Sequence, residues 1–214
     1  FDLLHMHWPE AYFQIKPRWK CDLRKWRYLI DLKLARLKTP IVFTAQNLYP
    51  HNREHERWVD MAYQWTVKCA DAVFVHTPYQ KEVFLQTYHI EPEKIRIIPP
   101  GDHSESFLPF EPKREARAQL GISETEKMVL MFGMISPYKG IDTVIRKWNA
   151  EAMEGARLYV VGPVMSGNYV RELEELAHGR KDIYLDIRQS WLPQEELRHW
   201  LYAADCALFH YKNI

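Results

Sequence analysis

Short apolar runs alternate with amphipathic stretches along the chain. The apolar runs predict strands at 2–7, 41–45, 72–76, 94–98, 128–132, 157–161, 183–188 and 206–210. The stretches between them have helical periodicity and predict helices at 19–37, 54–69, 78–88, 113–120, 141–153, 169–178 and 193–203. Strands that are apolar on both faces and separated by helices are typical of parallel sheets covered on two sides. The predicted fold class is therefore α/β.

The alternation is interrupted once, at residues 99–112. This stretch is rich in Pro, Ser and acidic residues and has neither helical nor strand periodicity. We therefore predict two Rossmann-like parallel-sheet domains at 1–103 and 113–214, joined by a linker at 104–112. Ligands of such folds bind outside the carboxyl ends of the strands, so the expected site is a cleft between the two domains.

One helix start carries a capping signature. Thr77 can cap the helix, Pro78 suits its first turn, and Gln80 stands three residues after the threonine. This spacing is typical of a capping box. We expect the helix to begin at Pro78.

Composition excludes some classes of protein. The chain has 214 residues and a formal net charge of +1, so no overall positive charge favours nucleic acid. No apolar run approaches the roughly 18 to 20 residues of a membrane span, and no signal peptide opens the chain. The three cysteines lie far apart without the spacing of a metal site, which indicates reduced thiols. They are Cys21, Cys69 and Cys206.

The turn after the predicted strand 128–132 is the most informative segment for function. It contains Gly133, Ser136, Lys139 and Gly140 before the next predicted helix. Glycines allow a ligand close to the backbone, helix N-termini attract anions, and a lysine adds a full positive charge. A diphosphate would suit this turn. Gly162, after the next strand, is expected to line the same cleft, with a plain turn as the alternative.

Residues 16–38 form the strongest compositional anomaly. They include nine Lys or Arg residues against Asp22 and Asp31. An apolar stripe at helical spacing runs through them and consists of Leu23, Trp26, Ile30, Leu34 and Leu37. The stripe could pack on the sheet or could dock on anionic lipid. We favour packing on the sheet, with the basic flanks left to contact headgroups.

Several strings resemble glycosyltransferases of the GT-B architecture, specifically the family 4 type. The strings are ADAVFVHTPYQKEVFLQTYHIEPEKIRIIPPGD (70–102), FGMISPYKGIDTVI (132–145), LYVVGPV (158–164) and LPQEELRHWLYAADCALFHY (192–211). The match spans nearly the whole chain and keeps the family's order. HMHWPE (5–10) and FTAQNLYPHN (43–52) resemble a bacterial subgroup that builds exopolysaccharide or capsule.

The resemblance implies roles for individual residues. The second domain would bind a nucleotide-diphosphate-sugar donor, with Lys139 on the diphosphate and the loop at Leu192 against the nucleobase. The first domain would bind the acceptor. His7 and Gln46, each following a strand, are the catalytic candidates, although glutamine cannot accept a proton. Asn47 and His51 are expected on the acceptor side.

The chain also departs from the family pattern. Gln46 stands where the subgroup usually has histidine, and Met134 stands where many relatives carry arginine. The acidic pair that relatives use on the donor sugar and ribose lies beyond the strand predicted to end at residue 210, and this sequence stops at residue 214 before reaching it. We therefore expect a fragment in which both domains are incomplete.

The predicted function is the transfer of a sugar from a nucleotide-diphosphate sugar to a saccharide or lipid-linked saccharide in polysaccharide biosynthesis. We expect no cofactor, no metal and no nucleic-acid partner, and a cytoplasmic location with peripheral contact at the inner face of the membrane as an option. A non-catalytic GT-B-like module is one alternative. A Rossmann dehydrogenase is another, but no GxGxxG motif follows any predicted strand.

Overall fold

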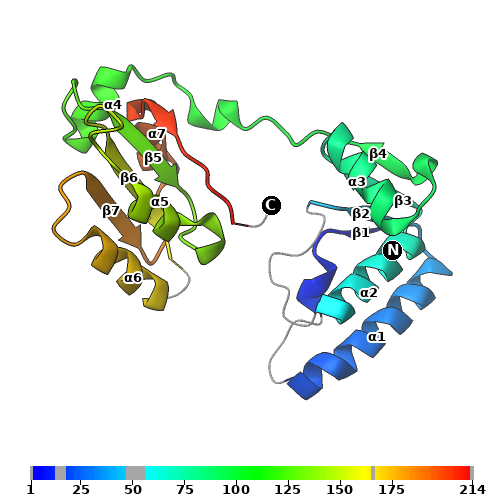
Figure 1. The fold of residues 1–214 in the computed structure, drawn as a ribbon. Coiled ribbons are helices and arrows are strands. Elements are labelled where there is room, and N and C mark those ends of the chain that lie inside the picture. Colours follow the sequence, from blue (N-terminus) through cyan, green and yellow to red (C-terminus); the bar gives the residue numbers. More distant parts are fainter. Residues whose placement is uncertain (1, 13–17, 47–55, 165–166, 213–214) are drawn as a thin grey trace. The chain divides into compact units, whose positions relative to one another are not determined.

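The computed structural model describes residues 2–12, 18–46, 56–164 and 167–212. The chain divides into two compact units, Phe1–Gly101 and Asp102–Ile214. Each unit contains one parallel four-stranded sheet with helices packed against it (Figure 1). The predicted fold class is confirmed.

The first unit has the strand order β1-β2-β3-β4, which follows the chain. The strands are β1 (Leu4–Met6), β2 (Ile41–Thr44), β3 (Ala72–Val75) and β4 (Ile95–Ile97). The helices are α1 (Arg18–Arg36), α2 (Glu56–Cys69) and α3 (Pro78–Tyr88), with short 3-10 turns at Pro9–Tyr12 and Pro92–Lys94. Helices α1 and α2 lie side by side (Figure 1).

Helix α1 contradicts the favoured interpretation of its sequence. The stripe that is expected to pack on the sheet is more than half exposed at every one of its five positions. The helix instead buries Tyr28 and Leu32, which join the core of the first unit, with Leu29 and Ala35 packed against it. Tyr28 also shares a buried hydrogen bond of 2.6 Å with Thr66 of α2. The sequence offers two apolar faces, and the more regular one is not the face that meets the sheet.

The capping signature of α3 is confirmed. Thr77 Oγ1 accepts a 3.0 Å hydrogen bond from the Gln80 amide, and the Gln80 side chain accepts one of 2.8 Å from the His76 amide. We expect Thr77→Ala to lower the free energy of unfolding by about 1 kcal/mol, because an amide at the helix start loses its acceptor. Urea denaturation measures this loss. Thr77→Ser keeps the hydroxyl and should retain most of the stability, and an equal loss in both variants would contradict the capping role.

The second unit has the strand order β7-β6-β5-β8. The strands are β5 (Met128–Phe132), β6 (Arg157–Pro163), β7 (Ile183–Arg188) and β8 (Cys206–Ala207). The helices are α4 (Lys113–Leu120), α5 (Ile141–Lys147), α6 (Gly167–Ala177) and α7 (Gln194–Ala203), with 3-10 turns at Ser104–Phe107 and Pro137–Lys139.

The side chains of β5 alternate between two cores, because successive residues of a strand point to opposite faces of the sheet. Val129 and Met131 pack in a cluster with Ile141 and Ile145 of α5. Met128 and Leu130 pack in a second cluster with Trp200 of α7. The sheet is therefore the middle of three layers, and this explains why its strands are apolar on both faces.

Two elements end three or more residues earlier than the sequence predicts, while several others differ by one or two. The predicted helix 141–153 corresponds to α5, but the cap of α5 is Trp148, whose backbone is extended. Beyond it, the Asn149 side chain accepts hydrogen bonds from the amides of Glu151 and Ala152, which favours a turn. The predicted strand 206–210 corresponds to β8, which ends at Ala207. The Leu208 amide still donates a 2.8 Å hydrogen bond to the Leu130 carbonyl of β5, and the strand assignment ends before it.

The segment 104–112, the predicted linker, packs against α7. The Tyr202 hydroxyl donates a 3.2 Å hydrogen bond to the Phe107 carbonyl, and His199 Nδ1 lies 2.7 Å from the Glu111 carboxylate. Both contacts lie within the second unit. The division into an acceptor-side and a donor-side domain remains a prediction.

Other features bear on the predicted partners. Of the residues that the structure describes, none forms a helix long and apolar enough to cross a bilayer. Cys69 and Cys206 are free cysteines. Burial raises the pKa of the Cys69 thiol, despite the opposing effect of Arg36. The side chain of Cys21 lies outside the described residues.

Candidate functional site

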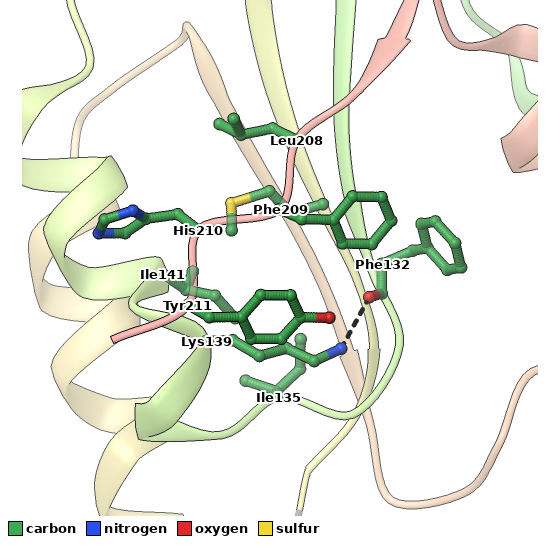
Figure 2. A pocket seen from close by; sticks show the side chains of 9 residues that line it. Phe132, Ile135, Lys139, Ile141, Leu208, Phe209, His210 and Tyr211 are labelled. Carbon is green, nitrogen blue, oxygen red and sulfur yellow. Dashed lines mark hydrogen bonds between the residues drawn. The ribbon is translucent and has the colours of Figure 1, made fainter. Parts of the chain in front are cut away.

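The strand order of the second unit defines a switch point. From β5 the chain passes to β6 on one side, and it later returns to β8 on the other side. The loops that follow β5 and β8 therefore diverge. Open parallel sheets bind their ligands in the crevice between such loops. A pocket lies at this place, lined by Phe132 at the end of β5, by Ile135 and Lys139 after it, and by the segment 208–211 after β8 (Figure 2).

The turn after β5 depends on glycine at positions where other residues would not fit. Gly162 has a φ of +152°, and a Cβ there would lie 2.2 Å from the Gly133 carbonyl oxygen. Gly133 has a φ of +91°, and its Cβ would meet the Lys139 ammonium at 2.9 Å. A Cβ at Gly140 would lie 2.7 Å from the His210 ring. The glycines thus permit close packing of the ends of β5 and β6 and of the segment after β8.

Lys139 is a partly buried cation beside the pocket. Its ammonium donates a 3.0 Å hydrogen bond to the Phe132 carbonyl (Figure 2). Among the described residues, no carboxylate lies within ion-pair distance of it. Burial lowers the pKa of Lys139, because the charged form has lost part of its hydration. A desolvated cation that faces no carboxylate is favourably placed to bind an anion.

One amide at the start of α5 already has a hydrogen-bond partner, whereas the first amides of a helix are ordinarily open. The Asp142 amide donates to the Tyr169 hydroxyl at 3.2 Å, and that hydroxyl donates to the Asp142 carboxylate at 2.9 Å. The helix also has no more than seven residues, so its dipole is small. The positive charge available at this turn therefore comes from Lys139 more than from the helix.

The segment after β8 is attached to the turn by an ion pair that sequence reasoning missed. The Lys212 ammonium lies 2.7 and 2.8 Å from the two Asp142 carboxylate oxygens, and the Lys212 amide donates to the Tyr138 carbonyl at 2.7 Å. Burial acts to raise the pKa of Asp142, but the hydrogen bonds from Lys212 and Tyr169 outweigh it and lower the pKa. The rings of Tyr138 and Tyr211 stack beside this ion pair with their centroids 5.8 Å apart.

Two other donor-side candidates lie near the same turns. Ser136 precedes the 3-10 turn and its side chain makes no capping hydrogen bond. Leu192 packs against the cluster that contains Trp200, while its neighbour Trp191 is 66% exposed. The end of β7 before this loop is fixed by Arg188, which donates to Asp186 and Glu196. Leu192 therefore has a packing role, and the nucleobase role remains a prediction.

The first unit brings two of its candidates to one edge. His7 follows β1 and Gln46 lies just beyond β2, and these strands are hydrogen-bonded neighbours in parallel. Both side chains are exposed. The His5 and His7 rings are 4.4 Å apart, and both burial and His7 lower the pKa of His5. Asn47 and His51 lie outside the described residues.

No metal centre is formed within the parts of the chain that the structure describes. No three His, Cys, Asp or Glu side chains there come together in a way that could hold an ion.

Comparison with known families assigns the first unit. Residues 1–102 match the family model described as Glycosyltransferase Family 4. This match covers the whole of the first sheet and its helices. The first unit is therefore similar to glycosyltransferase family 4 over its whole length, and we refer to it below as the family 4 domain.

Curated relatives extend the similarity beyond the family 4 domain. The chain is 29% identical over 177 residues to the D-inositol 3-phosphate glycosyltransferase of Mycobacteroides abscessus, covering 78% of this chain and 39% of that protein. It is 30% identical over 132 residues to the Mycobacterium ulcerans protein of the same name, covering 62% of this chain and 28% of that protein. The chain thus matches less than half the length of these relatives.

Solved structures agree with the fold of both units. Sucrose-phosphate synthase from Thermosynechococcus elongatus aligns with a TM-score of 0.68 at 22% identity, covering 96% of this chain and 49% of that one. Anabaena HepE, solved in complex with UDP-glucose, aligns with a TM-score of 0.63 at 16% identity, covering 85% and 50%. At these identities the likeness establishes the fold, which is the GT-B architecture that the family 4 domain implies.

Proposed function

We propose that the chain is part of a glycosyltransferase whose second unit binds a nucleotide-diphosphate sugar and whose family 4 domain binds the acceptor. The observation that carries this proposal is Lys139, a desolvated cation that faces no carboxylate of the described residues and lines a pocket at a switch point. HepE, which shares the fold, binds UDP-glucose in its crystal structure, and this supports a donor of the same class.

In the proposed reaction, the bond between the anomeric carbon and the diphosphate oxygen breaks while an acceptor hydroxyl forms its bond to that carbon. The leaving diphosphate gains negative charge, and Lys139 stabilises it after leaving the Phe132 carbonyl. The acceptor hydroxyl loses a proton. Of our two catalytic candidates His7 can accept it, whereas Gln46 can only hydrogen-bond the hydroxyl.

We further propose that the acceptor is a saccharide or lipid-linked saccharide used in polysaccharide biosynthesis. The strings around His7 and Gln46 that resemble the exopolysaccharide and capsule subgroup support this. The proposal includes no resident cofactor, and Lys139 contributes one positive charge toward the diphosphate.

Isothermal titration of the chain with UDP, GDP and NAD tests the class of ligand. We expect one of the two nucleoside diphosphates to bind and NAD not to compete with it. Binding of NAD alone would instead favour a dehydrogenase. Slow release of sugar from a bound nucleotide sugar would separate an enzyme from a module that binds without turnover.

The affinity for the nucleoside diphosphate should fall at alkaline pH. The cationic form of Lys139 binds the anion, and this form is lost as the pH rises through its pKa. Because burial lowers that pKa, the fall should begin below the ordinary lysine value of about 10.4. Titrations between about pH 7 and 10 measure it. Lys139→Ala should show no such fall, and an identical fall in that variant would assign the titration to another group.

A further inference from the structure

Helix α1 has two apolar faces on opposite sides. One face, with Tyr28 and Leu32, is buried against the first sheet. The other face is the outer stripe, which consists of Leu23, Trp26, Ile30, Leu34 and Leu37. Its side chains are 56–76% exposed.

Helix geometry explains how both faces coexist. Each residue turns the helix by about 100°, so a residue two positions further on lies about 200° away. Ile30 follows Tyr28 by two positions, and Leu34 follows Leu32 in the same way. The outer stripe therefore points away from the sheet, and the fold of the first unit does not bury it. An aligned row of large exposed apolar side chains marks an interaction surface.

Basic side chains border the outer stripe on both sides. Arg27 lies next to Leu23 and Leu34 on one edge, and Lys33 lies next to Trp26 and Leu37 on the other, as their positions around the helix require. Both are exposed. Arg27 also contacts Asp31 at 3.3 Å, but a surface ion pair of this kind is weak and leaves the guanidinium available. Residues 16–38 as a whole carry nine Lys or Arg against two Asp.

An apolar row bordered by cations is complementary to an anionic bilayer surface. The apolar side chains enter the boundary between headgroups and acyl chains, while lysines and arginines reach the phosphates. Each cation near such a surface contributes about fivefold to binding. Protein interfaces also combine an apolar centre with a polar rim, so the experiments below test a second copy of the chain as the alternative occupant.

We propose that α1 is an interfacial helix that lies on an anionic membrane through its outer stripe. This inference rests on the exposure of α1 and is independent of the proposed transferase activity. If both hold, the family 4 domain lies at the surface where a lipid-linked acceptor is found.

Co-sedimentation with vesicles tests the proposal. We expect the chain to bind vesicles of phosphatidylcholine with about one third phosphatidylglycerol at least tenfold more tightly than pure phosphatidylcholine, and to be released by high salt. Ile30→Ser with Leu34→Ser should lower this binding at least tenfold. The control is Tyr79→Ser with Ile98→Ser, which removes exposed apolar side chains of the same unit from outside α1 and should bind as the parent does.

A second variant tests whether the loss of binding in the stripe variant reflects lost lipid contacts or altered folding. Arg27→Gln with Lys33→Gln leaves the apolar row intact and should weaken binding to anionic vesicles about 25-fold, the product of two fivefold losses. The proposal would be overturned if the chain did not bind anionic vesicles or if it bound neutral vesicles equally well. It would also be overturned if the variant with Ile30→Ser and Leu34→Ser bound as tightly as the parent. A dimer in sedimentation equilibrium that the stripe variant abolishes would likewise overturn it, because a second copy would then cover the outer stripe.

Discussion

Lys139→Met is expected to weaken the binding of a nucleoside diphosphate by about 10- to 100-fold, the loss of one charge-assisted hydrogen bond to a phosphate. Methionine retains the apolar stem that lines the pocket and removes the cation. Burial lowers the pKa of Lys139, so the folded protein disfavours its charged form. The melting temperature of the free protein should therefore not fall. Isothermal titration and thermal unfolding measure the two effects.

The matched control for this variant is Lys147→Met. Lys147 is exposed in the last turn of α5 and does not line the pocket. It should leave the affinity within about twofold, because a distant exposed charge is screened by salt. If both variants weakened binding equally, the effect would come from net charge and not from a site at Lys139.

Gly162→Ala is expected to lower the free energy of unfolding by about 3 kcal/mol or more. The new Cβ would lie 2.2 Å from the Gly133 carbonyl oxygen, and a backbone atom cannot yield as a flexible side chain does. The φ of +152° adds backbone strain. Because Gly133 adjoins the Lys139 ammonium, the variant should also lose nucleotide affinity. Urea denaturation followed by titration of the folded fraction measures both losses.

Two other glycines serve as controls for the Gly162 variant. Gly179→Ala introduces strain at a φ of +73° without any atom within 4 Å, so it should cost about 1 kcal/mol. Gly167→Ala, at the first position of α6 with no close atom, should be nearly neutral. If all three variants lost equal stability, the loss in the Gly162 variant would come from replacing any glycine. It would then not come from a steric clash with the Gly133 carbonyl.

The strands are the most predictable part of this fold. β5 and β7 begin and end at the predicted residues. β5 is apolar throughout because both of its faces are buried, whereas β7, at the edge of the sheet, also carries Asp186 and Arg188. The prediction for β8 is too long, since Leu208 and Phe209 are apolar for a different reason: they line the pocket. An apolar run alone does not distinguish these two environments.

Helix α1 shows where periodicity fails. A helix with apolar residues on two opposite faces presents two stripes, and the more regular stripe is here not the one that is buried in the core. The site shows a second limit. Gly133, Lys139 and Gly140 could be found because they are close in sequence, whereas Asp142 and Lys212 are 70 positions apart and no local pattern links them.

A crystal structure of the chain with bound UDP would test the central claim most directly. We predict that the Lys139 ammonium leaves the Phe132 carbonyl and lies within about 3 Å of a diphosphate oxygen. A diphosphate bound elsewhere, with Lys139 still donating to Phe132, would contradict the account.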